Sequence, residues 1–182
     1  VAVARSDNLP VESNSKYQSA SYWLAKTLFR RGHNLDEAEQ LVKACRSANP
    51  RDGFYAELLA NLWLRRKKVD DETERVARQA IALLEAAHLK GWIVTGARIT
   101  LIEVLEQREK FAAAEASIEI ALKDSTLSKG NQAGLNLKLA ALLKRRQSIA
   151  AAADALERAV RLFKEAGADR QAAMALDDLT LL

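Results

Sequence analysis

The stretch LAKTLFRRGHNLDEAEQLVKACRSANP, residues 24–50, decides the fold because it holds two helices, the turn between them and a stop. The apolar positions of its first helix are Leu24, Ala25 and Leu28. Those of its second helix are Leu35, Ala38, Leu41, Val42 and Cys45. Gly32 supplies the backbone freedom that the turn between the helices needs, and Pro50 ends the unit because proline has no N–H to donate. Both apolar sets follow helical spacing, so the stretch predicts an antiparallel helix pair.

Polar residues at the starts of these helices predict how each one is capped. Asn34 precedes the second helix and Glu37 follows three residues later, which is the spacing of a capping box. Ser15 and Gln18 have the same spacing, so we expect the first helix to run from Ser15 to Arg31.

The rest of the chain repeats this unit. The corresponding leucines of the four first helices are Leu24, Leu59, Leu101 and Leu139, spaced by 35, 42 and 38 residues. A single helix pair cannot bury both of its faces, whereas stacked pairs can. We therefore expect an all-α protein, a right-handed α-solenoid of antiparallel helix pairs with about nine helices. The predicted repeats cover residues 15–50, 51–88, 91–124 and 130–166, with a partial repeat at 169–182.

The first residues predict a fragment of a longer protein. The chain begins with Val, and residues 1–14 contain a small-polar and proline pattern like that of residues 46–50. We interpret residues 1–14 as the tail of a preceding repeat or a linker, and residues 15–182 as one superhelical domain.

Composition limits the classes of function. Of the 182 residues, 49% are hydrophobic and 29% charged, with only two prolines and seven glycines, which favours helix. No apolar run reaches the roughly 18 residues of a membrane span. Cys45, the single cysteine, fits a reducing, cytoplasmic location. The net charge of +4 is spread among acidic residues, which argues against nucleic acid as the partner.

Residues that carry chemistry are sparse. His33 and His88 each lack a second metal ligand at helical spacing, and no glycine-rich phosphate loop is present. The acidic residues at 70–74 fit the first turn of a helix, where carboxylates interact favourably with the helix dipole. We therefore predict no metal, no cofactor and no enzymatic activity.

The repeated pattern resembles the tetratricopeptide repeat (TPR). The matching positions of the first repeat are Leu24, Ala25, Leu28, Gly32, Leu35, Ala38, Val42 and Pro50. Those of the third are Leu101, Leu105, Phe111, Ala114, Ile118 and Ala121, and those of the fourth are Leu139, Ala140, Leu143, Ile149, Ala152, Leu156 and Ala159. The resemblance implies a non-catalytic scaffold that binds a partner peptide or helix in a concave groove lined by the first helices.

The repeats are longer than the family's usual length, and this leaves an alternative open. Their length resembles the helical sensor domains of large bacterial transcription regulators, which implies a domain that senses a small effector or a regulator. A homo-oligomer formed through the terminal repeats also stays open.

The resemblance also implies which side chains line the groove. The candidates for partner binding are Trp23, Lys26, Phe29, Arg30, Asn61, Leu64, Arg65, Lys138 and Arg145. The apolar members would anchor a partner side chain, Asn61 would bond to its backbone, and the cations would attract carboxylates, so an acidic partner is one option. For Trp23 the other interpretation is packing against a preceding repeat.

Basic residues recur at the ends of the first helices, at 30–31, 65–68 and 144–146. They suit the negative end of each helix dipole. A basic stripe that docks an acidic protein or another polyanion is the alternative interpretation.

Overall fold

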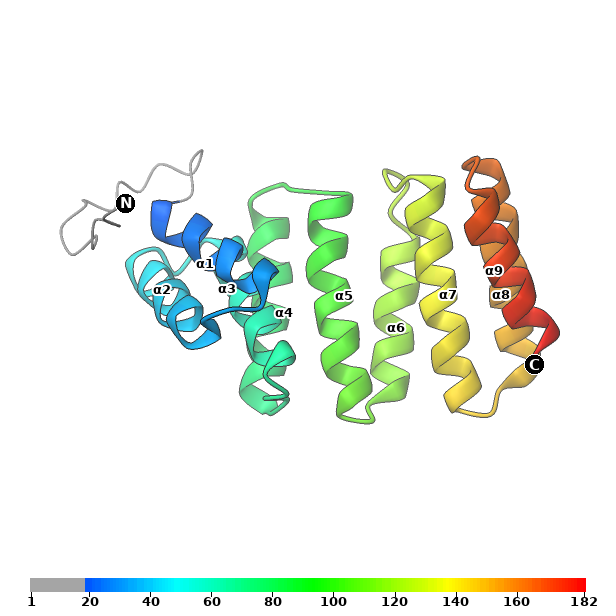
Figure 1. Cartoon of the computed structure of the whole chain (residues 1–182), viewed down its shortest axis with the longest axis horizontal. Helices are drawn as coiled ribbons and strands as arrows, with labels where there is room; N and C mark the ends of the chain where they lie inside the picture. Colours follow the sequence, from blue (N-terminus) through cyan, green and yellow to red (C-terminus); the bar gives the residue numbers. More distant parts are fainter. Residues whose placement is uncertain (1–18) are drawn as a thin grey trace. The chain divides into compact units, whose positions relative to one another are not determined.

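The computed structural model describes residues 19–182, which form nine α-helices and no strand (Figure 1). The helices are α1 (Ala20–Arg31), α2 (Leu35–Ala48), α3 (Gly53–Arg65), α4 (Asp71–Ala86), α5 (Trp92–Gln107), α6 (Phe111–Leu122), α7 (Lys129–Arg145), α8 (Ile149–Glu165) and α9 (Asp169–Thr180). This confirms the all-α prediction. The predicted tail at residues 1–14 lies outside the described residues.

The chain divides into two compact units, which we call the first unit (Val1–Ala87, with α1–α4) and the second unit (His88–Leu182, with α5–α9). Within the first unit, each helix packs on the next, and α1 also contacts α3. Within the second unit, packing again runs in chain order from α5 to α9. Sequential packing of this kind is what a stack of helix pairs requires.

Small and branched apolar residues at helical spacing form the core of each unit. In the first unit, the most deeply buried side chains include Val42, Leu59, Leu62, Trp63, Val76 and Leu84. In the second, they include Ile102, Leu105, Ile118, Leu135 and Leu142. Alanines such as Ala38 and Ala114 have no exposed surface, which lets neighbouring helix axes approach closely.

Five helices of the structure end in the same turn. In each, one residue adopts the left-handed conformation, and its N–H and the next N–H bond back to the helix. These residues are Gly32, Lys67, Glu109, Gln147 and Gly167, with φ between 57° and 70°. Glycine occupies only two of the five positions, so the pattern of hydrogen bonds rather than the residue type defines this turn.

Gly53, the first residue of α3, permits a close contact with α4. A Cβ atom at this position would lie 2.7 Å from Leu84 Cγ, 2.9 Å from Leu84 N and 3.0 Å from the Ala80 carbonyl oxygen. Any larger residue would therefore push α3 and α4 apart. The Asp52 side chain caps the same helix end by accepting from the N–H of Phe54 at 2.9 Å.

Of the two predicted capping boxes, one lies outside the described residues and the other does not form. The first helix begins at Ala20, with Ser19 as its cap, whereas the predicted Ser15–Gln18 pair lies outside the described residues. Asn34 adopts a left-handed conformation, φ 49°, and its side chain makes no cap bond, so the predicted capping box does not form.

In the second unit, Ser128 caps α7 by accepting from the N–H of Asn131, and residues 129–131 are helical. Ser148 precedes α8 without a side-chain cap bond. Ala168, rather than Asp169, stands at the cap position of α9. Cap chemistry at these positions depends on the local backbone, which residue type alone does not determine.

Candidate functional site

The predicted groove residues of the first unit gather on one surface, which we call the α1–α3 face. It consists of Trp23, Lys26, Phe29 and Arg30 on α1, and Glu57, Asn61 and Arg65 on α3. The three α3 residues are each four positions apart, so they share one side of that helix. The two helices contact each other directly.

Trp23 is the exposed aromatic residue of this face. Its side chain is 51% exposed, and its ring meets the buried Tyr22 edge-on at 5.6 Å between ring centres. The Lys26 ammonium lies 5.2 Å from the centre of the Trp23 ring and 5.4 Å from that of Tyr22. It also donates a 3.4 Å hydrogen bond to the Tyr22 hydroxyl. Trp23 thus offers a rigid apolar surface beside a fixed positive charge.

Arg65 connects the two helices of the face. Its guanidinium lies 5.2 Å from the centre of the Phe29 ring and donates to the Phe29 carbonyl oxygen. These two contacts hold the Arg65 guanidinium in one orientation.

Glu57 is the one acidic residue on α1 or α3. Burial raises the pKa of its carboxyl above the usual range, and the nearby Lys26 charge opposes that rise. Asn61, one turn later, donates a 3.1 Å hydrogen bond to the Glu57 carbonyl oxygen. Burial also raises the pKa of Tyr22, and the Glu57 charge adds to the effect, so Tyr22 stays a neutral phenol.

Charge is separated between the helices of the first unit. Together α1 and α3 carry four basic residues and one acidic residue, whereas α2 and α4 carry seven acidic and four basic residues. Taken together, the first helices are therefore net positive, with the excess charge on α1, and the second helices are net negative. A net positive surface attracts negatively charged groups through long-range electrostatics.

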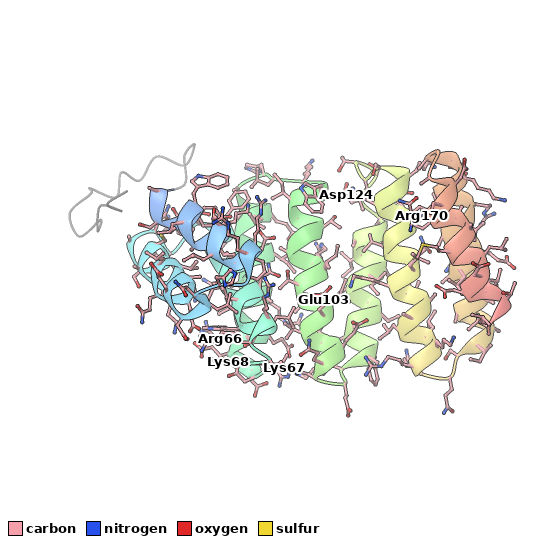
Figure 2. The ribbon with its side chains drawn as sticks, viewed as in Figure 1. Arg66, Lys67, Lys68, Glu103, Asp124 and Arg170 are labelled. Carbon is pink, nitrogen blue, oxygen red and sulfur yellow. The ribbon has the colours of Figure 1, made fainter. Side chains whose placement is uncertain are left out.

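Three of the residues predicted to line the groove do not lie on the α1–α3 face. Leu64 is only 8% exposed and belongs to the core. In the second unit, Lys138 lies on α7 and forms a 2.8 Å ion pair with Glu103 of α5, which is labelled in Figure 2. Arg145 lies at the end of α7 with its guanidinium 4.8 Å from the Phe111 ring centre. These last two residues belong to a different unit from the α1–α3 face.

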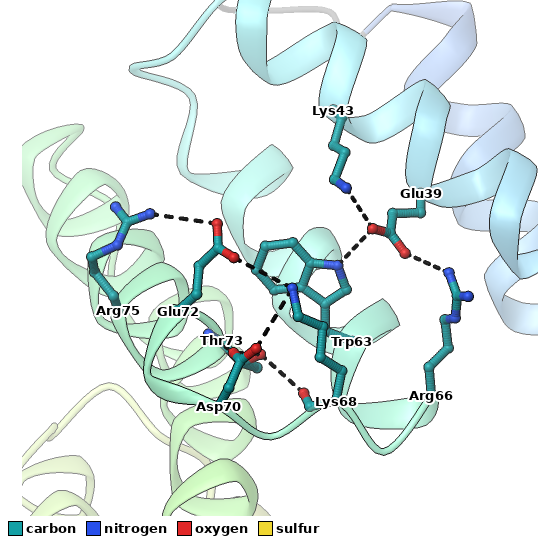
Figure 3. Close-up of polar contacts among 9 residues, drawn as sticks. All are labelled: Glu39, Lys43, Trp63, Arg66, Lys68, Asp70, Glu72, Thr73 and Arg75. Atoms are coloured by element: carbon teal, nitrogen blue, oxygen red, sulfur yellow. Dashed lines mark hydrogen bonds and ion pairs between the residues drawn. The ribbon is translucent and has the colours of Figure 1, made fainter.

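A polar network surrounds the buried Trp63 (Figure 3). Its indole N–H donates a 2.9 Å hydrogen bond to Glu39 of α2, which also pairs with Lys43 and Arg66. The Lys68 ammonium lies 3.9 Å from the centre of the Trp63 ring and pairs with Asp70 and Glu72 of the α4 start. Every polar group here has a partner, so the network joins α2, α3 and α4 rather than forming a vacant site.

Some of the basic residues at the helix ends are neutralised by the chain's own carboxylates. Arg66, Lys67 and Lys68 follow one another after α3 (Figure 2). Arg66 pairs with Asp36 and Glu39, and Arg146 after α7 pairs with Glu115. Exposed cations that are paired in this way attract an external polyanion less strongly, which weakens the stripe hypothesis.

Two hollows lie in the second unit. One, of about 410 Å³, lies between α7 and α9, and the other, of about 180 Å³, lies between α5 and α7 beside the exposed Trp92. Small residues line both hollows and are the feature of the sequence that indicates them. Ala140 and Ala141 line the first hollow, and Gly130 and Gly134 line the second.

Residues 19–182 contain no group of three or more His, Cys, Asp or Glu side chains placed to hold a metal ion. Within the same range, every helix is too short or too polar to cross a bilayer.

Comparison with known proteins identifies the class of fold. No protein-family model matches this chain, and no curated protein matches its sequence. A solved structure of a kinesin light chain-like protein from Podospora anserina, with nearly identical TPR-like repeats, superposes with a TM-score of 0.65 at 15% identity, over 88% of this chain and 92% of that one. A double mutant of MamA from RS-1 gives 0.62 at 13% identity, over 90% and 95%.

These likenesses show the fold: the chain is an all-α solenoid of TPR-like helix pairs. The predicted fold class is thereby confirmed.

Proposed function

We propose that the chain is a non-catalytic scaffold whose α1–α3 face binds an acidic protein segment that carries a large apolar side chain. TPR-like folds commonly present first-helix side chains to protein partners. The observation that carries the proposal is the charge separation in the first unit, combined with the exposed Trp23 beside Lys26.

The roles of the individual residues follow from their surroundings. Trp23 packs against the apolar side chain of the segment, as aromatic residues do at interface hot spots. Lys26, Arg30 and Arg65 bind carboxylates, and the stacking of Arg65 on Phe29 fixes its orientation.

Selection from a displayed library of random peptides tests this proposal. We expect enrichment of peptides in which two or more Asp or Glu residues flank a Trp, Phe or Leu. Trp23→Ala should lower the affinity for an enriched peptide by about thirtyfold, which is the effect of losing one binding hot spot. Binding should also weaken as salt is raised.

Lys164→Gln on α8 is the matched control, because it removes one exposed cation from the second unit and should leave peptide affinity unchanged. Enrichment of neutral or basic peptides would contradict the proposal. So would full affinity in a Lys26→Gln, Arg30→Gln, Arg65→Gln variant.

A second candidate function is effector sensing, which the hollow of about 410 Å³ in the second unit favours. A sensor differs from a scaffold because a small molecule should stabilise it.

The cytoplasmic location, the absence of a nucleic-acid partner and the homo-oligomer stay predictions.

A further inference from the structure

The larger hollow has the size and lining of a small-molecule site. Its volume of about 410 Å³ falls within the range of about 300–1,000 Å³ typical of such sites. Most of its lining is apolar and comes from Leu137, Ala140 and Ala141 of α7, Leu156 of α8 and Leu182 after α9. An apolar group that enters it gains free energy by leaving water.

Three charged side chains also line the hollow, namely Lys138, Lys144 and Asp178. Lys138 is already neutralised by Glu103 at 2.8 Å. In the part of the chain that the structure describes, neither Lys144 nor Asp178 forms an ion pair. One cation and one anion therefore remain available to a molecule in the hollow.

We propose that this hollow binds a small apolar zwitterion, an apolar amino acid or dipeptide with free amino and carboxyl groups. The ligand carboxylate pairs with Lys144 and its ammonium with Asp178, while its apolar side chains contact Ala141, Leu156 and Leu182. A ligand that carried only one charge would satisfy one of the two groups and meet repulsion from the other. The proposal does not depend on the acidic-segment proposal, whose residues lie in the other unit.

Titration of the isotope-labelled 182-residue chain with leucyl-leucine tests the site. We expect saturable NMR shifts at the amides of residues 137–144 and 178–182. Isothermal titration calorimetry should measure the heat of binding for the same titration. Two analogues each keep one charge: 4-methylpentanoate has the carboxylate and 3-methylbutylamine the ammonium. Each should bind at least about tenfold more weakly, because one charge-assisted contact is lost. Leucine itself, run in parallel, shows whether one residue suffices, and saturable binding of either ligand supports the site.

Two isosteric variants give a readout that a merely structural role would not produce. Lys144→Gln should weaken leucyl-leucine about tenfold and remove the disadvantage of the amine analogue. Asp178→Asn should likewise weaken the binding of leucyl-leucine about tenfold and remove the disadvantage of the carboxylate analogue. Ala141→Phe should fill the hollow and abolish binding, with circular dichroism confirming that the helices remain. Lys164→Gln is again the control.

The proposal is overturned if neither zwitterion gives saturable shifts at these residues. It is equally overturned if Lys144→Gln and Asp178→Asn leave affinity and charge preference unchanged. Neither result bears on peptide binding at Trp23.

Discussion

The Trp63 indole donates a 2.9 Å hydrogen bond to the carboxylate of Glu39, which lies 24 residues earlier in the chain and on another helix pair. Burial alone would raise the pKa of Glu39. The hydrogen bonds from Lys43 and Trp63, together with the charges of Lys43 and Arg66, outweigh burial and lower the pKa below its usual value of 4.5. A carboxyl whose pKa is lowered by folding stabilises the folded state when it is ionised.

The first prediction concerns the pH dependence of stability. The Glu39 contribution is complete above the usual pKa of 4.5 and is lost as pH falls through the lower pKa of the folded state. Glu39→Gln should cost about 1 kcal/mol at neutral pH, and this cost should shrink toward zero in acid. Urea unfolding followed by circular dichroism from pH 7 to 3 measures both quantities.

Glu119→Gln on the exposed surface of α6 serves as the control and should change stability by less than about 0.5 kcal/mol at every pH. If the cost of Glu39→Gln stayed constant with pH, the ionised pair would not be the stabilising species.

The second prediction compares two glycines. Gly53→Ala should destabilise the protein by about 1–3 kcal/mol, because the new Cβ would lie 2.7 Å from Leu84 Cγ. Gly134→Ala in α7 should stabilise it by about 0.5–1 kcal/mol, because nothing lies within 4 Å of that Cβ and alanine favours helix. Thermal unfolding of the two variants should therefore shift in opposite directions. Equal shifts would mean that helix propensity alone matters at both sites.

The third prediction concerns the left-handed turn residues. Gln147 has φ 59°, a conformation that glycine adopts more readily, so Gln147→Gly should raise stability by about 1 kcal/mol. Gly167→Ala should lower it by a similar amount, although the position has open space around it. Chemical denaturation of both variants measures the two effects. A loss of stability in Gln147→Gly would show that its side chain, rather than the turn, governs this position.

The fourth prediction concerns Asp124, which joins two loops of the second unit. Its carboxylate accepts from the N–H of Gly91 at 3.0 Å and from the N–H and hydroxyl of Thr126. Asp124→Ala should leave the buried Gly91 N–H without this acceptor and cost about 1–3 kcal/mol. Hydrogen exchange of the Gly91 amide should speed up accordingly.

Asp154→Ala on the exposed side of α8 should leave that exchange rate unchanged. Unaltered exchange in Asp124→Ala would instead assign the protection of Gly91 to its burial alone.

The positions of the helices could be predicted because the apolar spacing of each pair is regular. The caps could not be predicted: Asn34 needs an extended backbone for its side chain to reach the free N–H groups of the first turn, and it instead adopts φ 49°. The family resemblance implies a groove position for Leu64, and periodicity could not correct this, because α3 is apolar on nearly all sides and its exposed face cannot be told from its buried ones. The Glu39–Trp63 pair and the hollow beside Ala141 depend on tertiary packing, which no local pattern encodes.

The three tryptophans differ widely in exposure: Trp63 is 2% exposed, Trp23 51% and Trp92 67%. An aqueous quencher such as iodide should therefore reach two indoles and spare the third, giving a downward-curved quenching plot. A segment bound at the α1–α3 face would shield Trp23, whereas Trp92, in the other unit, would stay quenchable. The chain thus carries its own optical reporters, with one in the core of the first unit, one on the α1–α3 face and one in the second unit.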